Sequence, residues 1–224
     1  MKKSAIIVAG GTGTRMNILV PKQFLILAGK PVVMHSMQAF SDAIPDISMV
    51  LVLPPGQFGQ WEKLCMEYSF NLPHKLVPGG PSRFHSVQNA LPALSGDDLV
   101  AIHDGARPLV SAALIHRVFN TALLLGNCIP VIPVNETVRR VSGETSTPAD
   151  RNSLRLVQTP QVFYSSILRK GYEQPYREQF TDDAMVMESI GETIHLAEGE
   201  PFNLKITHKH DLELAESLYK LLHP

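Results

Sequence analysis

The sequence has little of what marks several classes of protein. Its 224 residues include two cysteines, Cys65 and Cys128, which stand in no CxxC or metal-binding spacing. This excludes a disulfide scaffold and predicts reduced thiols in a cytoplasmic protein. The 20 lysines and arginines face 21 aspartates and glutamates, so no overall positive charge favours a nucleic acid or an anionic membrane as partner. No apolar run approaches the roughly 20 residues that cross a bilayer.

What the sequence does contain is a regular alternation of short apolar runs and amphipathic stretches. From Ser4 to Val134 it reads as five strands separated by four helices. Such a pattern is typical of an α/β fold, a mostly parallel Rossmann-like sheet with helices on both faces and ligands at the carboxyl ends of the strands. The length favours one domain over residues 1–224. We therefore expect the site in the loops that follow strands, at Gly10–Arg15, Gly79–Arg83 and His103–Pro108.

Three later segments are expected to depart from this alternation. The stretch from about 135 to 157 is polar with a Ser/Gly/Thr turn at its centre, which predicts a projecting β-hairpin arm. Asp182 and Asp183 are expected to begin a helix rather than to chelate a metal. The C-terminal stretch is predicted to form two short strands and a closing amphipathic helix, with Thr207 or Asp211 near its start.

The first of the three loops has the composition of a phosphate-binding loop. In VAGGTGTRMNILVPKQF the glycines follow a predicted strand directly, where backbone N–H groups can approach anionic oxygen atoms. The dinucleotide pattern GxGxxG fails because Met16 stands at its third glycine, and the P-loop pattern is absent too. The candidate phosphate-holding residues are Gly10, Gly11, Thr12, Gly13, Arg15 and Lys22.

Six further motifs point to one family. They are GGPSRFHSV at 79–87, HDGARP at 103–108, DRNSL at 150–154, QTPQVF at 158–163, TDDA at 181–184 and NLKIT at 203–207. With the glycine loop and the Pro-Lys-Gln run, they resemble the 2-C-methyl-D-erythritol 4-phosphate cytidylyltransferase family over nearly the whole chain. The resemblance implies a fold of the nucleotide-diphospho-sugar transferase type. It also implies transfer of CMP from CTP to 2-C-methyl-D-erythritol 4-phosphate, with release of pyrophosphate, in non-mevalonate isoprenoid synthesis.

The resemblance implies a role for each matching residue. Around the α-phosphate it places Arg15, Lys22 and Lys205. With the nucleotide it places Gly10, Gly11, Thr12, Gly13, Gly80, Ser86 and Asp104, the last also near a Mg²⁺ ion. At the polyol phosphate it places Arg107, Thr137, Arg151 and Thr159. Because a phosphate nucleophile is already anionic, such a site needs positioning and charge neutralisation rather than a strong base.

Two residues of the HDGARP motif also have structural interpretations. Asp104 could cap the following helix or pair with Arg107. His103, beside it, is expected to be a structural residue at the end of a strand rather than a base or a metal ligand.

A polar arm such as 135–157 leaves exposed edges unless something covers them. In the family the arms of two subunits embrace, so the resemblance implies a homodimer with shared active sites.

Two other functions stay open at this point. The sister family of ribitol-5-phosphate cytidylyltransferases shares the glycine loop, Pro-Lys-Gln and Gln-Thr-Pro-Gln. Ala106 and the Arg139–Arg140 pair favour the methylerythritol enzyme. Against this, Arg155 stands where that family often has tryptophan, and Glu136 stands where both families commonly have aspartate. The second alternative is a regulatory protein that binds CTP without turnover. The intact set of phosphate-facing cations argues against it, since a binding module could lose them without penalty.

Overall fold

The alternation of strands and helices that the sequence predicts is present. The computed structural model describes residues 1–11, 21–96 and 99–223. Strands β1 (Lys3–Val8), β4 (Ser48–Leu53), β5 (Lys75–Pro78), β6 (Leu99–Asp104) and β7 (Asn127–Pro133) alternate with helices α1 (Val32–Ala43), α2 (Phe58–Glu67), α3 (Arg83–Ala90) and α4 (Ala112–Leu125). Short 3-10 turns lie at η2 (Lys22–Phe24), η3 (Pro55–Gln57), η4 (Leu91–Ala93) and η5 (Arg151–Ser153).

One sheet joins the strands of the alternating part to three later ones. Its order is β10-β7-β11-β6-β1-β4-β5, with β12 also pairing with β7. The added strands are β10 (Arg155–Val157), β11 (Gln161–Tyr164) and β12 (Leu196–Glu198). The centre, from β6 to β5, is parallel, whereas β11 and β10 run antiparallel to their neighbours. Val8 lies opposite Val52 and Asp104, so the carboxyl ends of β1, β4 and β6 meet at one edge of the sheet.

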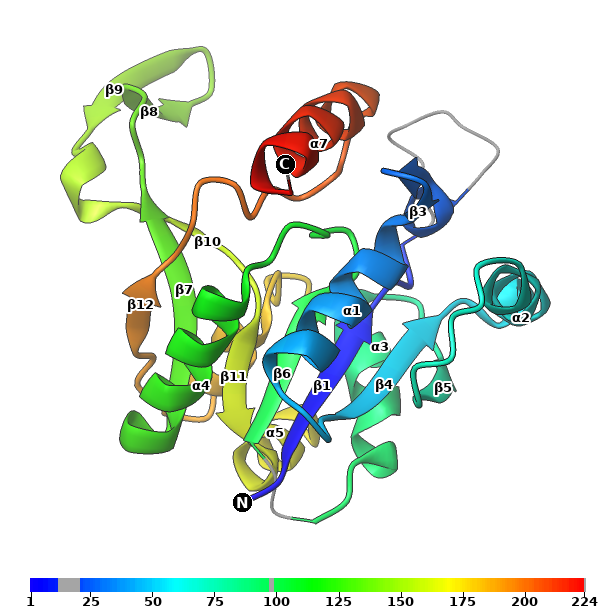
Figure 1. The fold of residues 1–224 in the computed structure, drawn as a ribbon. Coiled ribbons are helices and arrows are strands. Elements are labelled where there is room, and N and C mark those ends of the chain that lie inside the picture. The colour runs from blue at the N-terminus through cyan, green and yellow to red at the C-terminus, as the bar shows by residue number, and fades with distance from the viewer. Residues whose placement is uncertain (12–20, 97–98, 224) are drawn as a thin grey trace.

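The two faces of the sheet are covered by different helices because successive side chains of a strand point to opposite faces. On β1, Ile7 belongs to a core with Met37 of α1 and Phe119 of α4. Its neighbour Ile6 belongs to a second core with Phe84 of α3 and Leu168 of α5 (Ser165–Tyr172). Figure 1 shows α1 and α4 on one face and α3 and α5 on the other. The mostly parallel sheet with helices on both faces is therefore confirmed.

The last helix, α7 (Lys209–Leu222), closes the molecule over a two-stranded ribbon. The ribbon consists of β2 (Ile26–Leu27) and β3 (Lys30–Pro31), and Ala215 of α7 shares a small core with Leu27. Asp211 caps α7 by accepting the backbone N–H groups of Thr207 and His208 at 2.8 and 2.7 Å. The predicted closing helix and its start near Asp211 are confirmed.

The prediction of two short strands before this helix is only half right. β12 forms, but in the described part of the chain Asn203–Thr207 forms no strand. Instead the Ile206 N–H donates to the Ala106 carbonyl at 2.8 Å, and Arg107 Nη1 donates to the Asn203 carbonyl at 2.7 Å. These backbone groups are satisfied by the loop after β6, and this attachment holds the segment at the carboxyl edge of the sheet.

The polar segment forms the projecting hairpin that the sequence predicts. Strands β8 (Val138–Ser142) and β9 (Thr145–Ala149) pair antiparallel, and Gly143 has a left-handed φ of 57° at the turn. Figure 1 shows the hairpin extending beyond the end of β7. The predicted arm is too long at its far end, since β10 pairs with β7 and belongs to the main sheet. Within the described ranges, no helix combines the length and apolar character needed to cross a bilayer.

The core between α4 and the sheet yields a prediction about stability. Phe119 is fully buried, whereas Leu124 on the same helix is 81% exposed. Phe119→Ala should lower the free energy of unfolding by about 3–5 kcal/mol, because it removes buried contacts and leaves a cavity. Leu124→Ala is the matched control and should change it by less than about 0.5 kcal/mol. Urea unfolding followed by circular dichroism measures both, and equal values would contradict the assignment of this core.

Candidate active site

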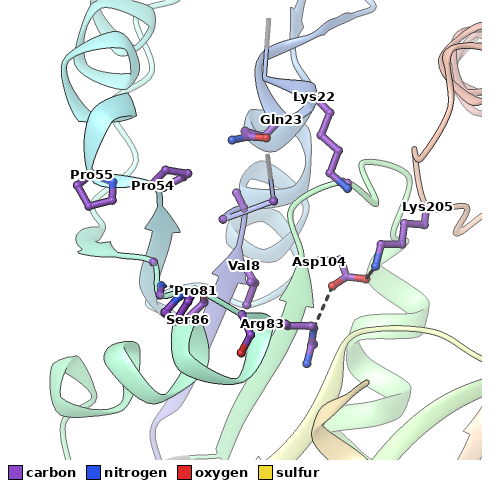
Figure 2. Close-up of a pocket in the computed structure, with 17 residues that line it drawn as sticks. Val8, Lys22, Gln23, Pro54, Pro55, Pro81, Arg83, Ser86, Asp104 and Lys205 are labelled. Atoms are coloured by element: carbon purple, nitrogen blue, oxygen red, sulfur yellow. Dashed lines mark hydrogen bonds and ion pairs between the residues drawn. The ribbon is translucent and has the colours of Figure 1, made fainter. Parts of the chain in front are cut away.

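A cavity of about 530 Å³ lies at the carboxyl edge of the parallel strands. Gly10 and Gly11 border it after β1, Pro54 and Pro55 after β4, the loop 79–83 after β5, and Asp104 and Ala106 after β6. Lys22 and Lys205 reach it from elsewhere in the chain (Figure 2). The described parts of all three loops that the sequence singles out therefore border this first cavity, at the edge where open α/β sheets bind their ligands.

One wall of the first cavity consists of glycine backbone around the hydroxyl of Ser86. The Gly80 N–H donates to Ser86 Oγ at 3.1 Å, and a Cβ at Gly10 would lie 3.2 Å from the same oxygen. A Cβ at Gly80 would overlap the Cβ of His85. Glycines at these positions let two loops approach one side chain closely. The wall thus offers a hydroxyl and backbone polar groups to a ligand.

Asp104, at the end of β6, lies among three cations. Its Oδ2 is 2.8 Å from Lys205 Nζ and 3.5 Å from Arg107 Nε, and its Oδ1 is 3.5 Å from Arg83 Nε. Burial alone would raise the pKa of Asp104, but Arg83, Lys205 and Arg107 outweigh it and hold the pKa well below its usual range. The pairing with Arg107 is confirmed. The alternative of a helix cap is wrong, since Ser111 Oγ accepts the Leu114 N–H at the start of α4.

Lys22 and Lys205 bring positive charge to the first cavity from distant parts of the sequence. In Figure 2 their side chains point in the direction of the Asp104 carboxylate. The Lys22 chain passes close to the glycine loop, since a Cβ at Gly11 would lie 3.5 Å from Lys22 Cε. The other predicted loop residues, Thr12, Gly13 and Arg15, lie outside the described residues.

A second cavity of about 410 Å³ adjoins the first and shares Arg83, Asp104 and Lys205 with it. Arg107 and Thr159 line it, with Gln161 and residues of α6 (Asp183–Glu188). The structure thus brings two of the predicted polyol-phosphate residues together beside the first cavity. Asp182 caps α6 by accepting the Met185 N–H at 3.0 Å, which confirms the predicted helix start.

His103 is structural, as expected. It is fully buried, and burial lowers its pKa to about 4, so the ring is neutral near pH 7. Its Nε2 lies 3.1 Å from the Arg107 carbonyl and therefore donates, which leaves Nδ1 to accept from the Thr159 hydroxyl at 3.1 Å. The same hydroxyl accepts the Asp104 N–H at 3.1 Å. In this arrangement Thr159 and His103 together fix the backbone that carries the Asp104 carboxylate.

Two predicted residues are not brought to the site within this chain. Thr137 and Arg151 flank the hairpin, are exposed, and line neither cavity. The Arg151 guanidinium donates to the Asn135 carbonyl of its own chain. Among the residues weighed for substrate identity, Ala106 lines the first cavity. The remaining ones lie on or beside β8 and β10 and line neither cavity: Glu136, Arg139, Arg140 and Arg155.

Sequence reasoning missed Arg83, which lines both cavities. Its Nη2 lies 2.6 Å from Oδ2 of Asp183, a fully buried carboxylate that also accepts the Tyr172 hydroxyl at 2.5 Å. The only local signal is its place in GGPSRFHSV, directly after the helix cap Ser82. An arginine in that position is ordinarily solvated, and its partner Asp183 lies 100 residues further along the chain.

The side chains of the site can hold a metal ion only if a bound ligand supplies most of the atoms that coordinate the metal. Within the described residues, no group of three His, Cys, Asp or Glu side chains gathers. Asp104 is a carboxylate that both cavities share. Magnesium is commonly held by one or two carboxylates together with phosphate oxygens of a substrate. Both Asp104 oxygens already face cations, so the residues present fit an ion held mainly by phosphate oxygens, with Asp104 close to it.

Comparison with known proteins agrees with this geometry. The chain matches the model of the family described as 2-C-methyl-D-erythritol 4-phosphate cytidylyltransferase over residues 4–220. The protein of that name from Bacteroides fragilis is 45% identical over 218 residues, which are 97% of this chain and 100% of the relative. The one from Porphyromonas gingivalis is 45% identical with 97% of each chain covered. The crystal structure of the enzyme from Thermus thermophilus superposes with a TM-score of 0.77 at 32% identity, covering 98% of this chain and 100% of that one. Since the match runs from β1 into α7, the chain belongs to the 2-C-methyl-D-erythritol 4-phosphate cytidylyltransferase family.

Proposed function

We propose that the chain transfers CMP from CTP to 2-C-methyl-D-erythritol 4-phosphate, releasing pyrophosphate and forming 4-diphosphocytidyl-2-C-methyl-D-erythritol for isoprenoid synthesis. The observation that carries this proposal is the pair of adjoining cavities that share Arg83, Asp104 and Lys205. The first, with its glycine wall, suits a nucleotide, and the second, lined by Arg107, suits a small phosphate. The two substrates would bring their phosphates together beside Lys205, where the cavities meet.

The chemistry follows from that meeting of phosphates. An oxygen of the polyol phosphate forms a bond to the α-phosphorus of CTP, and the bond from that phosphorus to the oxygen bridging to the β-phosphate breaks. Pyrophosphate leaves with the electron pair. The nucleophile is anionic from the start, so the protein needs no base and contributes orientation and positive charge. Lys22 and Lys205 are placed to supply that charge, because both line the first cavity.

The individual roles are proposals supported by position. Gly80 and Ser86 would hold the cytosine, and Gly10 and Gly11 the triphosphate, because all four line the first cavity. For Thr12, Gly13 and Arg15 the support is the sequence motif alone. Mg²⁺ would be held by triphosphate oxygens close to Asp104, and when bound it would neutralise phosphate charge. Arg107 would bind the polyol phosphate, and Thr159 would line the same cavity while its hydroxyl holds His103 and the Asp104 backbone.

The remaining polyol-phosphate residues motivate the proposal of a homodimer. Thr137 and Arg151 are exposed beside the hairpin and line neither cavity of their own chain. The edges of β8 and β9 pair only with each other among the described strands, so a partner could cover them. We place this enzyme in the cytoplasm, where the free thiols of Cys65 and Cys128 would remain reduced.

A comparison of several nucleotides and polyol phosphates as substrates tests the proposed function. The purified protein should release pyrophosphate from CTP with methylerythritol phosphate, more slowly with ribitol 5-phosphate, and only weakly from UTP or ATP. EDTA should abolish release and Mg²⁺ should restore it, because the triphosphate charge is otherwise poorly neutralised. Faster turnover of ribitol 5-phosphate would contradict methylerythritol phosphate as the substrate but would still support cytidylyl transfer. CTP binding without pyrophosphate release would indicate instead a regulatory protein that binds CTP without turnover.

Lys22→Ala tests the charge at the α-phosphate. Loss of one positioned electrostatic group should lower kcat by about 10²–10³. Lys30→Ala is the control, since Lys30 lies on β3 outside both cavities and should leave kcat unchanged. Steady-state pyrophosphate release gives kcat and KM for each variant. A Lys22→Ala enzyme with normal kcat and a raised KM for CTP would show that Lys22 only binds the nucleotide.

Mixing two inactive variants tests whether the sites are shared. Lys22→Ala damages the site of its own chain, whereas Arg151→Ala should damage the site of the partner. Co-expression in equal amounts should recover about a quarter of the wild-type activity, because half of the dimers are mixed and each mixed dimer keeps one intact site. Sedimentation velocity confirms the dimer, and separately purified variants that are never mixed serve as the control. Activity that stays at the level of the single variants would contradict a shared site.

A further inference from the structure

The orientation of the Asp104 carboxylate depends on Arg83. Among the ion pairs of the described residues, Oδ1 faces Arg83 Nε, and Oδ2 faces Lys205 and Arg107. The terminal torsion of an aspartate is soft, so the side chain does not fix this orientation by itself. Arg83 on Oδ1 and the two cations on Oδ2 therefore hold the carboxylate from both sides.

Arg83 is itself held from the opposite side. Its Nη2 donates to Asp183 Oδ2 at 2.6 Å, and the Asp183 carboxylate is fully buried. The other oxygen of Asp183 accepts the Tyr172 hydroxyl, and the Asp183 N–H donates to Gln161 Oε1 at 3.1 Å. These contacts hold the Asp183 carboxylate in place. The Arg83 guanidinium therefore stays between the carboxylates of Asp183 and Asp104.

The chemistry of arginine suits this bridging position. A guanidinium is planar and rigid, and here one nitrogen faces Asp104 while another faces Asp183. A lysine at position 83 would keep the charge, but a single ammonium on a flexible chain cannot hold both carboxylates in fixed geometry. The Arg83 side chain is 22% exposed and borders both cavities, so the bridge lies directly behind the proposed reaction site.

We infer that Arg83 is a positioning residue for the proposed cytidylyl transfer. It acts through the chain Asp183–Arg83–Asp104–Lys205, which fixes where the Lys205 ammonium stands between the two cavities. The backbone of Lys205 is already anchored, because the next residue, Ile206, donates to the Ala106 carbonyl. What remains to be fixed is the end of a flexible side chain that is 37% exposed, and the Asp104 contact at 2.8 Å does this.

This inference rests on the proposed function, and a double-mutant cycle tests it. Arg83→Lys should lower kcat by about ten-fold or more, since small displacements of a catalytic group can cost up to about 10². In a Lys205→Ala background the same change should cost less than about two-fold, because Arg83 then has no ammonium to position. The KM for CTP should stay within about three-fold. Equal losses of kcat in the two backgrounds would overturn the inference, since a merely structural role acts independently of Lys205.

A matched control and a second variant complete the test. Arg117 is ion-paired with Glu200 at 3.7 Å and lines neither cavity, so Arg117→Lys should leave kcat unchanged. Asp183→Asn releases Arg83 from its other end and should lower kcat in the same Lys205-dependent way, with activities scaled to the folded fraction by circular dichroism. Should Arg83→Lys fail to fold, the Asp183→Asn cycle alone decides the matter by the same comparison.

A structural readout separates this inference from the proposed function. A crystal structure of Arg83→Lys, or of Asp183→Asn, should lack the contact between Lys205 Nζ and Asp104 Oδ2. Retention of that contact at its present 2.8 Å would overturn the inference whatever the substrate is. A wild-type protein that releases no pyrophosphate from CTP and methylerythritol phosphate would overturn the proposed function instead, without bearing on this contact.

Discussion

The whole site depends on one buried carboxylate at the end of a central strand. Arg83, Arg107 and Lys205 come from three separated parts of the chain, and without Asp104 their charges would repel one another in a partly desolvated space. Burial raises the pKa of Asp104, but the three cations lower it by more, so the pKa stays well below the usual range. The carboxylate therefore remains charged at any physiological pH. It lets positive charge gather before any substrate arrives.

Such a preformed cluster is what a transfer between two phosphates requires. Most of the catalytic contribution in such reactions comes from positioning and from charge that is already in place, and rearrangement during the reaction would weaken both. Here the charged residues that line the cavities are held in place by further residues of the fold. Thr159 and His103 hold the backbone of Asp104, while Asp183 and Tyr172 hold Arg83. Each link places a buried polar group against a partner, so that little of the site depends on exposed side chains alone.

The sequence predicts the parts of this structure that are local. The alternation of strands and helices, the loops after β1, β5 and β6, the hairpin and the start of α6 each depend on neighbouring residues, and all are present. The errors concern contacts between distant segments. β10 joins the main sheet through β7, and Asn203–Thr207 is held by the loop after β6 instead of forming a strand. Arg83 escapes notice because its partner Asp183 lies 100 residues away and no periodicity links the two.

The same difference explains why the motifs identify the reaction more readily than the substrate. The first cavity is formed largely by consecutive strand-and-loop units, and glycine, Ser86 and Lys22 form compact patterns within them. The second cavity is assembled from the end of β10, the turn before β11, the helix α6 and the segment at Lys205, which come together only in the folded chain. Ala106 lines the first cavity, so in the proposed arrangement, with the polyol phosphate in the second cavity, its small side chain bears on the polyol only indirectly, through the loop that carries Asp104 and Arg107. Related enzymes can therefore share the nucleotide motifs, and even the Gln-Thr-Pro-Gln run that lines the second cavity, while the other segments around that cavity change. Polyol specificity must accordingly be sought in the spatial arrangement of those segments rather than in any one motif.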